Sequence, residues 1–464
     1  MICGAAQVFA LPVKGTVKNA ADGSPLSGVI VTDGYDFVRT DERGAFAFEA
    51  SVLAQFISVV TPSGWLAPCE EGFPRYWQVI DPRTKRYDFR LTEWAASAEG
   101  YDMMAIADPQ PKTYEQFERL QREIMPPLRE HIGEADKSRA RAAIILGDIV
   151  WDSPQLFDAV KAEFGTLGIP VYPVIGNHDH DLNCNTDREA TARYSQSFGP
   201  TYYAFDMGHT HYVVLDDICY YGAKRYIEEI DDIQCAWLRK YAELLPKGSR
   251  LCIAMHAPVW KSWRQGSGMA SALKLAEELK DYEVHFLTGH THVNSNYDVG
   301  NGSALEHNVA QICGNLWRDP INYDGTPRGY LLLREEGDRL IWDYRQIDTD
   351  DDARMRIWNL GEVKGYKDRV VAKIWEWDSH WTVVWYEDGE YRGSMQRIQI
   401  ADPDYEKWVE ECRAAGEKIT NSRRPNPVNF YFTAKPSPAA KSVRVVATDR
   451  FGRQYEGCID VVRD

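Results

Sequence analysis

The fold is decided by one short polar stretch, Gly176-Asn177-His178-Asp179-His180-Asp181. The apolar run 169–175 precedes it and indicates a strand buried on both faces, as in a parallel sheet. We expect the glycine to let the backbone turn sharply, so that the polar loop lies at the carboxyl end of this strand, where ligands bind in open α/β sheets. Because Asn and Asp also favour turns, a plain turn is the alternative for this stretch taken alone.

Four further apolar runs end in similar side chains. The runs 103–107, 142–146, 251–255 and 284–287 lead into Asp108-Pro109-Gln110, Gly147-Asp148, His256 and Gly289-His290-Thr291-His292, respectively. Helical stretches over residues 115–131, 154–167, 234–245 and 271–280 alternate with the runs and predict an α/β domain. Strands that each end in carboxylate, amide or imidazole groups indicate a metal site, and this set of donors suits Zn²⁺, Fe or Mn²⁺ rather than Ca²⁺.

Composition restricts the class of protein. A length of 464 residues is typical of about three domains, and 44% hydrophobic residues suffice for cores without disulfides. The net charge of −16 argues against general nucleic-acid binding, which needs a basic face, but not against a small phosphorylated substrate. No apolar run is long enough to predict a transmembrane segment. The cysteines form no CxxC pair, so we expect no cysteine zinc site, and Cys184 with Cys219 is one conceivable disulfide.

Changes in periodicity divide the chain into segments. Residues 1–10 end in Val8-Phe9-Ala10, which fits a signal-cleavage site, and they are either the remnant of an export signal or an unstructured terminus. Residues 11–93 contain short strands separated by turns, which predicts an all-β sandwich. Residues 97–345 carry the α/β pattern. Residues 347–464 are predicted to be β-rich, with a helix over 403–416.

The order Asp-x-Gln, Gly-Asp, Gly-Asn-His-Asp, His, Gly-His-x-His resembles the calcineurin-like metallophosphoesterase superfamily across about residues 97–345. The resemblance implies an α/β (α+β) core in which a two-sheet β-sandwich is flanked by helices, with an all-β sandwich domain on each side of it in this chain. The N-terminal segment also resembles transthyretin-like or carboxypeptidase-regulatory-like sandwiches. Because this layout is similar to exported bacterial members, we expect a periplasmic or cell-envelope protein.

The resemblance also assigns roles to particular residues. It implies two divalent or trivalent metal ions, of Mn, Fe or Zn, with Asp148 as the bridging carboxylate. Asp108 and His292 would complete one site, and Asn177, His256 and His290 would hold the other. His178 would be catalytic rather than a ligand, protonating the leaving oxygen or steadying the phosphoryl group.

Gln110 departs from the family pattern, because most members have His at this position. Its side chain is either a ligand through the amide oxygen or a hydrogen-bonding neighbour of the metal. As a neutral ligand it would bind the first metal more loosely, or favour a harder cation.

Other residues have weaker claims to the site. We expect Asp179 to orient a metal-bound imidazole. His180 and Asp181 contact either the substrate or the ligands, or they belong to a solvated loop. Asp152 and the neighbouring Trp151 could line the cleft. The candidates to bind a phosphate and its organic group are Trp263, Arg264 and Trp317.

The leading hypothesis for function is hydrolysis of a phosphate monoester or diester by metal-bound hydroxide at a binuclear centre. The alternative is an extracytoplasmic binding protein with a vestigial metal site and recognition by the β domains. A third hypothesis keeps the enzyme and makes the flanking sandwiches docking modules for a glycan, the envelope or a partner.

Overall fold

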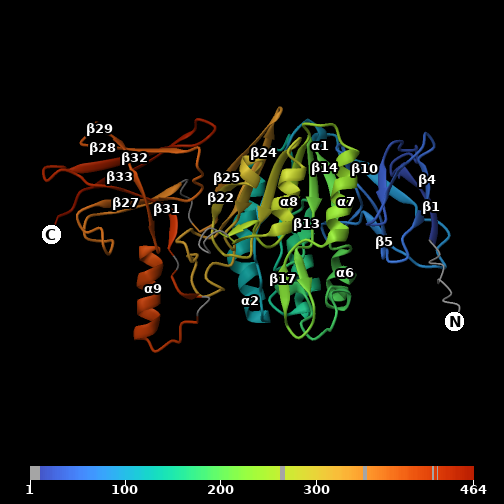
Figure 1. The fold of residues 1–464 in the computed structure, drawn as a ribbon, viewed down its shortest axis with the longest axis horizontal. Helices are drawn as coiled ribbons and strands as arrows, with labels where there is room; N and C mark the ends of the chain where they lie inside the picture. Colours follow the sequence, from blue (N-terminus) through green and yellow to red (C-terminus); the bar gives the residue numbers. More distant parts are fainter. Residues whose placement is uncertain (1–10, 262–266, 349–352, 421–422, 426, 464) are drawn as a thin grey trace, which may run out of the picture.

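The computed structural model describes residues 11–261, 267–348, 353–420, 423–425 and 427–463. Three parts follow one another along the molecule (Figure 1): a β domain at the N-terminal end, a central domain of sheets and helices, and a second β domain that carries α9 at the C-terminal end. The suggested signal remnant, residues 1–10, lies outside the described residues.

Two sheets form the centre, as the resemblance implied. The first has the order β13 (Val171–Val174), β12 (Ala140–Leu146), β11 (Tyr101–Ile106), β24 (Gly329–Glu336), β25 (Arg339–Gln346). The second has the order β14 (Tyr203–Met207), β15 (Thr210–Val214), β18 (Arg250–Ala254), β21 (Glu283–Thr288), β23 (Ala304–Asn308), β22 (Ser295–Val299). The strands that precede the polar loops pair in parallel within each sheet, so their carboxyl ends share one edge. Their inner side chains pack face to face in one core.

Helices cover the outer faces of this sandwich. The predicted helices are confirmed as α2 (Tyr114–Arg119) continued by η1 (Leu120–Ile124) and α3 (Met125–Glu134), η2 (Pro154–Leu156) with α4 (Phe157–Gly165), α7 (Asp232–Glu243) and α8 (Ala270–Glu278). Leu120, Ile124 and Leu128 recur every fourth residue and are buried against the first sheet. The sequence did not predict α5 (Asp187–Ala190) and α6 (Ala192–Phe198), because both are too short to show a helical period.

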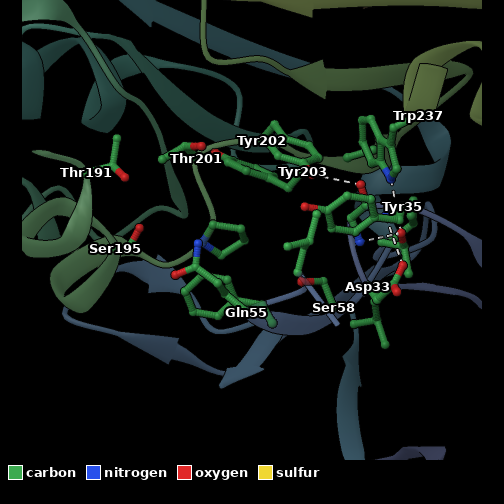
Figure 2. Close-up of a pocket in the computed structure, with 18 residues that line it drawn as sticks. Asp33, Tyr35, Gln55, Ser58, Thr191, Ser195, Thr201, Tyr202, Tyr203 and Trp237 are labelled. Atoms are coloured by element: carbon green, nitrogen blue, oxygen red, sulfur yellow. Dashed lines mark hydrogen bonds between the residues drawn. The ribbon is translucent and has the colours of Figure 1, made fainter. Parts of the chain in front are cut away.

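The N-terminal segment folds as the predicted sandwich. Its sheets have the orders β4 (Ala45–Ala50), β1 (Leu11–Asn19), β10 (Phe89–Glu93), β6 (Trp65–Leu66) and β3 (Phe37–Arg39), β2 (Ile30–Thr32), β5 (Phe56–Val59), β9 (Trp77–Val79). It docks on the central domain, where the Trp237 indole donates to Thr32 Oγ1 over 3.0 Å and the Tyr202 hydroxyl donates to the Gly34 carbonyl over 2.8 Å. A cavity of about 120 Å³ remains at this junction (Figure 2), and none of the predicted site residues that the structure describes lines it.

The C-terminal segment is also a β-sandwich. Its sheets have the orders β26 (Met355–Trp358), β27 (Val370–Ile374), β31 (Val428–Ala434), β30 (Gln396–Ile400) and β29 (Glu390–Ser394), β28 (Thr382–Glu387), β32 (Ser442–Thr448), β33 (Gln454–Asp460). The predicted helix appears as α9 (Pro403–Ala414). Shorter elements complete the chain: β7 (Cys69–Glu70), β8 (Phe73–Pro74), α1 (Ala96–Glu99), η3 (Asn177–Asp179), β16 (Ile218–Tyr220), β17 (Tyr226–Glu228), β19 (Trp260–Lys261), β20 (Ser267–Gly268) and η4 (Gly300–Gly302).

The described residues contain neither a membrane-spanning helix nor a disulfide. Among the described helices, none has both the length and the apolar character that a membrane crossing needs. The described cysteines carry free thiols, so the conceivable Cys184–Cys219 disulfide does not form.

A buried ion pair joins the C-terminal domain to the central domain. Lys373 of β27 lies 2.9 Å from Asp324 Oδ2 and 2.8 Å from Thr326 Oγ1, and the Lys373 and Asp324 side chains are both fully buried. Asp324 also accepts the backbone N–H of Asn294, two residues after His292. The C-terminal domain therefore supports one of the predicted ligand loops.

Replacing Lys373 with Met should destabilise the protein by about 3–5 kcal/mol, because Asp324 would be left as a buried, uncompensated charge. The midpoint of guanidinium unfolding, followed by tryptophan fluorescence, measures this loss. Lys435→Met is the control, since Lys435 pairs with Asp368 on the surface, where the two side chains are 62% and 63% exposed. Equal midpoints for the two variants would contradict the role given to Lys373.

Candidate metal centre

The predicted metal ligands all follow carboxyl ends of neighbouring strands. β11 leads to Asp108 and Gln110, β12 to Asp148, β13 to Asn177 in η3, β18 to His256, and β21 to His290 and His292. Hydrogen bonds join these loops. The backbone N–H of His290 donates to Asp108 Oδ2 over 3.0 Å, and the backbone N–H of Gln110 donates to the backbone carbonyl of Asp148 over 3.0 Å. The structure therefore gathers all seven residues into one site.

One group of donor atoms surrounds the Nε2 atom of His256. This nitrogen lies 3.0 Å from Asn177 Oδ1, 3.1 Å from His290 Nδ1 and 3.3 Å from Asp148 Oδ1. Nδ1 of His256 lies 2.8 Å from the Leu146 carbonyl, and Nε2 of His290 lies 3.1 Å from Glu228 Oε1. Because these oxygens only accept, each outer ring nitrogen carries hydrogen, and His256 Nε2 and His290 Nδ1 are the ring atoms left to bind a metal ion.

The charge balance of this group favours a cation. Burial would lower the pKa of His256, but the Asp148 carboxylate raises it to about 10. For Asp148 the effects have the opposite sign: burial raises its pKa, but the neighbouring His256 outweighs burial and holds the pKa well below its usual range. A proton on His256 thus supplies the positive charge that Asp148 requires, and a metal ion bound there would displace that proton.

A second group of donors surrounds His292. Its Nε2 atom lies 3.5 Å from Asp108 Oδ1 and 3.0 Å from the Gln110 side-chain nitrogen. That nitrogen also donates to Gln311 Oε1 over 3.2 Å. Among the described residues, neither Asp108 Oδ1 nor Gln110 Oε1 has a hydrogen-bond partner, although both atoms are buried. Such oxygens are costly to bury alone, so this group also fits a cation.

Several candidate ligands have an unusual backbone conformation. The φ angles of Asp108, Gln110, Asp148, His290 and His292 are 50°, 30°, 48°, 65° and 60°. Residues with a Cβ avoid this left-handed region, and each instance costs about 1–3 kcal/mol. Strain of this kind is typical of functional sites, where the surrounding structure holds it in place.

The role of Gly176 differs from the prediction. Its φ of −115° and ψ of 176° are extended, so the residue makes no sharp turn. Glycine is needed because a Cβ there would clash with the backbone nitrogen of Asp148. Gly147, with a φ of 81°, provides the turn that was expected of Gly176, and a Cβ there would clash with the His256 ring.

His178 lies beside the candidate ligands without joining them. Its backbone N–H donates to Asp148 Oδ1 over 2.9 Å, and its Nδ1 lies 2.8 Å from Asp152 Oδ1. The ring packs on Trp151 with centroids 4.9 Å apart, and the side chain stays 26% exposed. Burial lowers the pKa of His178, but Asp148 and Asp152 outweigh this effect and raise it. Asp152 therefore orients His178.

Among the residues that follow His178, Asp179 differs from its expected role. Asp179 accepts backbone N–H groups of Gly176, Ile149 and Val150 over 2.8–3.1 Å, so it binds two loops together instead of orienting an imidazole. His180 is 1% exposed, which excludes the solvated loop for this residue. Asp181 accepts the Asn183 amide over 3.0 Å and closes a local turn.

Trp317 is buried and its indole donates to the Pro109 carbonyl over 3.1 Å. It therefore holds the loop that carries Asp108 and Gln110 rather than binding a substrate. Trp263 and Arg264 lie outside the described residues.

The sequence did not identify four side chains that hold this site together. Glu228 accepts from His290, Gln311 accepts from Gln110, Asp217 accepts the amides of His256 and Ala257, and Asn308 donates to the Gly289 carbonyl. Each comes from a part of the chain without a motif. Only Gln311, in the segment that follows β23, stands out in the sequence, because it is a polar residue within an apolar stretch.

Three family models match the chain. The model described as calcineurin-like phosphoesterase matches residues 102–294. Those described as the N terminal and the C terminal of calcineurin-like phosphoesterase match residues 11–94 and 306–455. The transthyretin-like resemblance and the export of the protein stay predictions. Among curated proteins, no match to the chain was found.

Three solved structures illustrate the more distant similarities. The sulfate thiohydrolase SoxB of Thermus thermophilus has a TM-score of 0.34 and 10% identity, over 53% of this chain and 56% of its own. The phosphopantetheinyl hydrolase PptH of Mycobacterium tuberculosis has a TM-score of 0.28 and 12% identity, over 46% and 91%. Vps29 of Entamoeba histolytica, complexed with Zn²⁺, has a TM-score of 0.23 and 13% identity, over 53% and 99%.

The assignment therefore depends on the three family models, which follow one another along the chain, and on the site at the strand ends. The chain belongs to the calcineurin-like phosphoesterase family.

Proposed function

We propose that the protein hydrolyses a phosphate monoester or diester at a centre of two metal ions. The convergence of acceptor atoms around His256 Nε2, beside the unpartnered oxygens of Asp108 and Gln110, carries this proposal. Asp108, Gln110 and His292 would hold the first ion. Asn177, His256 and His290 would hold the second, with Asp148 shared between them.

The bound ions would activate the attacking water and neutralise charge on the phosphoryl oxygens. The chain itself supplies the proton for the leaving oxygen. His178 is suited to this task because Asp152 fixes its Nδ1, so Nε2 is left to face the substrate. Asp148 and Asp152 favour the charged form of the ring, which can donate a proton.

The positively charged side chain of Lys112 lies next to Trp151, beside His178. Lys112 Nζ is 5.0 Å from the Trp151 ring centroid, and Trp151 packs on His178. The residue follows the Asp108–Gln110 loop, so its charge is available to an anionic substrate near His178.

Asp148→Asn should remove the two ions of this centre and abolish turnover, because the amide cannot supply the charge that two cations share. Metal content by mass spectrometry and rates on p-nitrophenyl phosphate and bis(p-nitrophenyl) phosphate measure the two effects. The control is Asp158→Asn, a carboxylate that pairs with Arg193 on the surface. Full activity in Asp148→Asn would contradict the mechanism. A wild-type protein that binds no metal would favour the alternative of a binding protein with a vestigial site.

His178→Ala should keep the metal content and lower kcat by about 10²–10⁴-fold, the usual contribution of a positioned proton donor. The same two assays separate the effects. His380→Ala, a surface histidine whose side chain is 56% exposed, should leave both quantities unchanged. Loss of metal from His178→Ala would show that His178 is a ligand and overturn its assigned role.

Glu228→Ala should weaken metal binding by about 10–100-fold, because the His290 ring would lose the acceptor that orients it. Competition with a chelating indicator measures the affinity for Zn²⁺. Glu228→Gln keeps an acceptor oxygen without the charge and should give an intermediate loss. Wild-type affinity in Glu228→Ala would show that Glu228 does not position the ligand.

A further inference from the structure

A second polar cluster lies next to the metal centre but shares none of its candidate ligands. Its core is the pair formed by His180, just after η3, and Asp187, at the start of α5; Asp216, between β15 and β16, is near enough for the charge of Asp187 to raise its pKa. The amide of Tyr220 in β16 donates to Asp187 Oδ1 over 2.9 Å, which fixes the position of that carboxylate. The proposed reaction assigns no role to these three residues.

His180 directs an unused lone pair into this cluster. Its Nδ1 lies 2.9 Å from the Gly176 carbonyl, and because a carbonyl only accepts, the hydrogen is on Nδ1. The side chain is fully buried, and its Nε2 has no hydrogen-bond partner among the described residues. Burial lowers the pKa of His180 to about 4, which keeps the ring neutral near pH 7. The buried Nε2 is therefore an acceptor without a donor.

The atom that faces this nitrogen is also an acceptor. His180 Nε2 lies 3.8 Å from Asp187 Oδ1, too far for a hydrogen bond between them. Two atoms bridged by one water molecule lie roughly 4.5 Å apart, because each bond is about 2.8 Å long. Two ligands of one metal ion, each about 2.1 Å from it, lie about 3–4 Å apart. The observed separation fits a shared cation better than a shared water.

The surroundings hold further carboxyl groups, and the described residues provide no Lys or Arg that pairs with them. Asp216 is 5% exposed, and burial together with the charge of Asp187 raises its pKa. Asp217 and Asp231 add two more carboxyl groups. Asp217 accepts the backbone N–H groups of His256 and Ala257, and Asp231 accepts that of Gln234. Within the described part of the chain, no Lys or Arg forms an ion pair with Asp187, Asp216, Asp217 or Asp231.

We propose that His180 and Asp187 bind a further divalent cation, with Asp216 as the neighbouring carboxylate. One imidazole with carboxylates suits Zn²⁺ or Mn²⁺ rather than Ca²⁺. The ion would join the segment after η3 to α5 and β16. It would also hold the Gly176 carbonyl in place through His180, one residue before the candidate ligand Asn177.

The full-length Asp148→Asn variant isolates this site, because that substitution disables the main centre without touching the cluster. After metal removal, loading with Zn²⁺ and desalting, it should retain one equivalent of zinc per chain. Adding Asp187→Asn should remove this equivalent. Asp187 is a suitable target because its side chain is 48% exposed, so its replacement does not disturb a core. His180→Gln should have the same effect.

Asp181→Asn in the same background is the matched control. It removes an equal charge from the same loop, but its carboxylate serves the local turn at Asn183, so the zinc equivalent should remain. Zinc content that Asp187→Asn leaves unchanged would overturn the proposal, as would an Asp148→Asn protein without zinc. A proton or a water molecule between His180 and Asp187 would then take the place assigned to the ion. Because turnover is not the readout, these outcomes do not depend on the proposed phosphoesterase activity.

Discussion

The structure depends on holding a strained backbone at the ends of β11, β12 and β21, three of the five strands that lead to the candidate ligands. Asp108, Asp148 and His290 have φ angles of 50°, 48° and 65°, in the left-handed region that side chains with a Cβ avoid. This conformation turns each side chain toward the common centre immediately after its strand ends. At about 1–3 kcal/mol for each residue, the loops would relax if nothing opposed them. The rest of the domain has to supply that opposition.

Buried polar side chains from other parts of the chain provide it. Asp179 binds the backbone after Asp148, Trp317 binds the backbone at Gln110, and Asp217 binds the amides at His256. Each hydrogen bond is shielded from water, so breaking one would leave a buried polar group unpaired. The centre is therefore rigid before any ion arrives, which lowers the cost of ordering on binding. The C-terminal domain contributes through Lys373 and Asp324, whose carboxylate holds the loop after His292.

The electrostatics of the site reinforce this geometry. In a protein of net charge −16, buried Asp148 raises the pKa of His256 to about 10, so the centre attracts positive charge even without metal. Cations in such a centre would supply the attraction for an anionic phosphoryl group that the acidic surface does not. Outer acceptors at Leu146 and Glu228 fix which ring nitrogens face inward, and thereby which atoms serve as ligands.

The sequence by itself determined the α/β core, its longer helices and the seven candidate ligands, because the periodicity of apolar residues and the polar residues at strand ends are local patterns. It did not reveal the partners of those ligands. Glu228, Gln311 and Asp217 reach the site from segments without a motif, and only the packing of the two sheets brings them there. Tertiary structure also decided that Gly176 is needed for close approach to Asp148, and that Trp317 supports a loop instead of binding a substrate. Contacts between residues far apart in the chain produce no periodic pattern in the sequence, so only the folded structure reveals them.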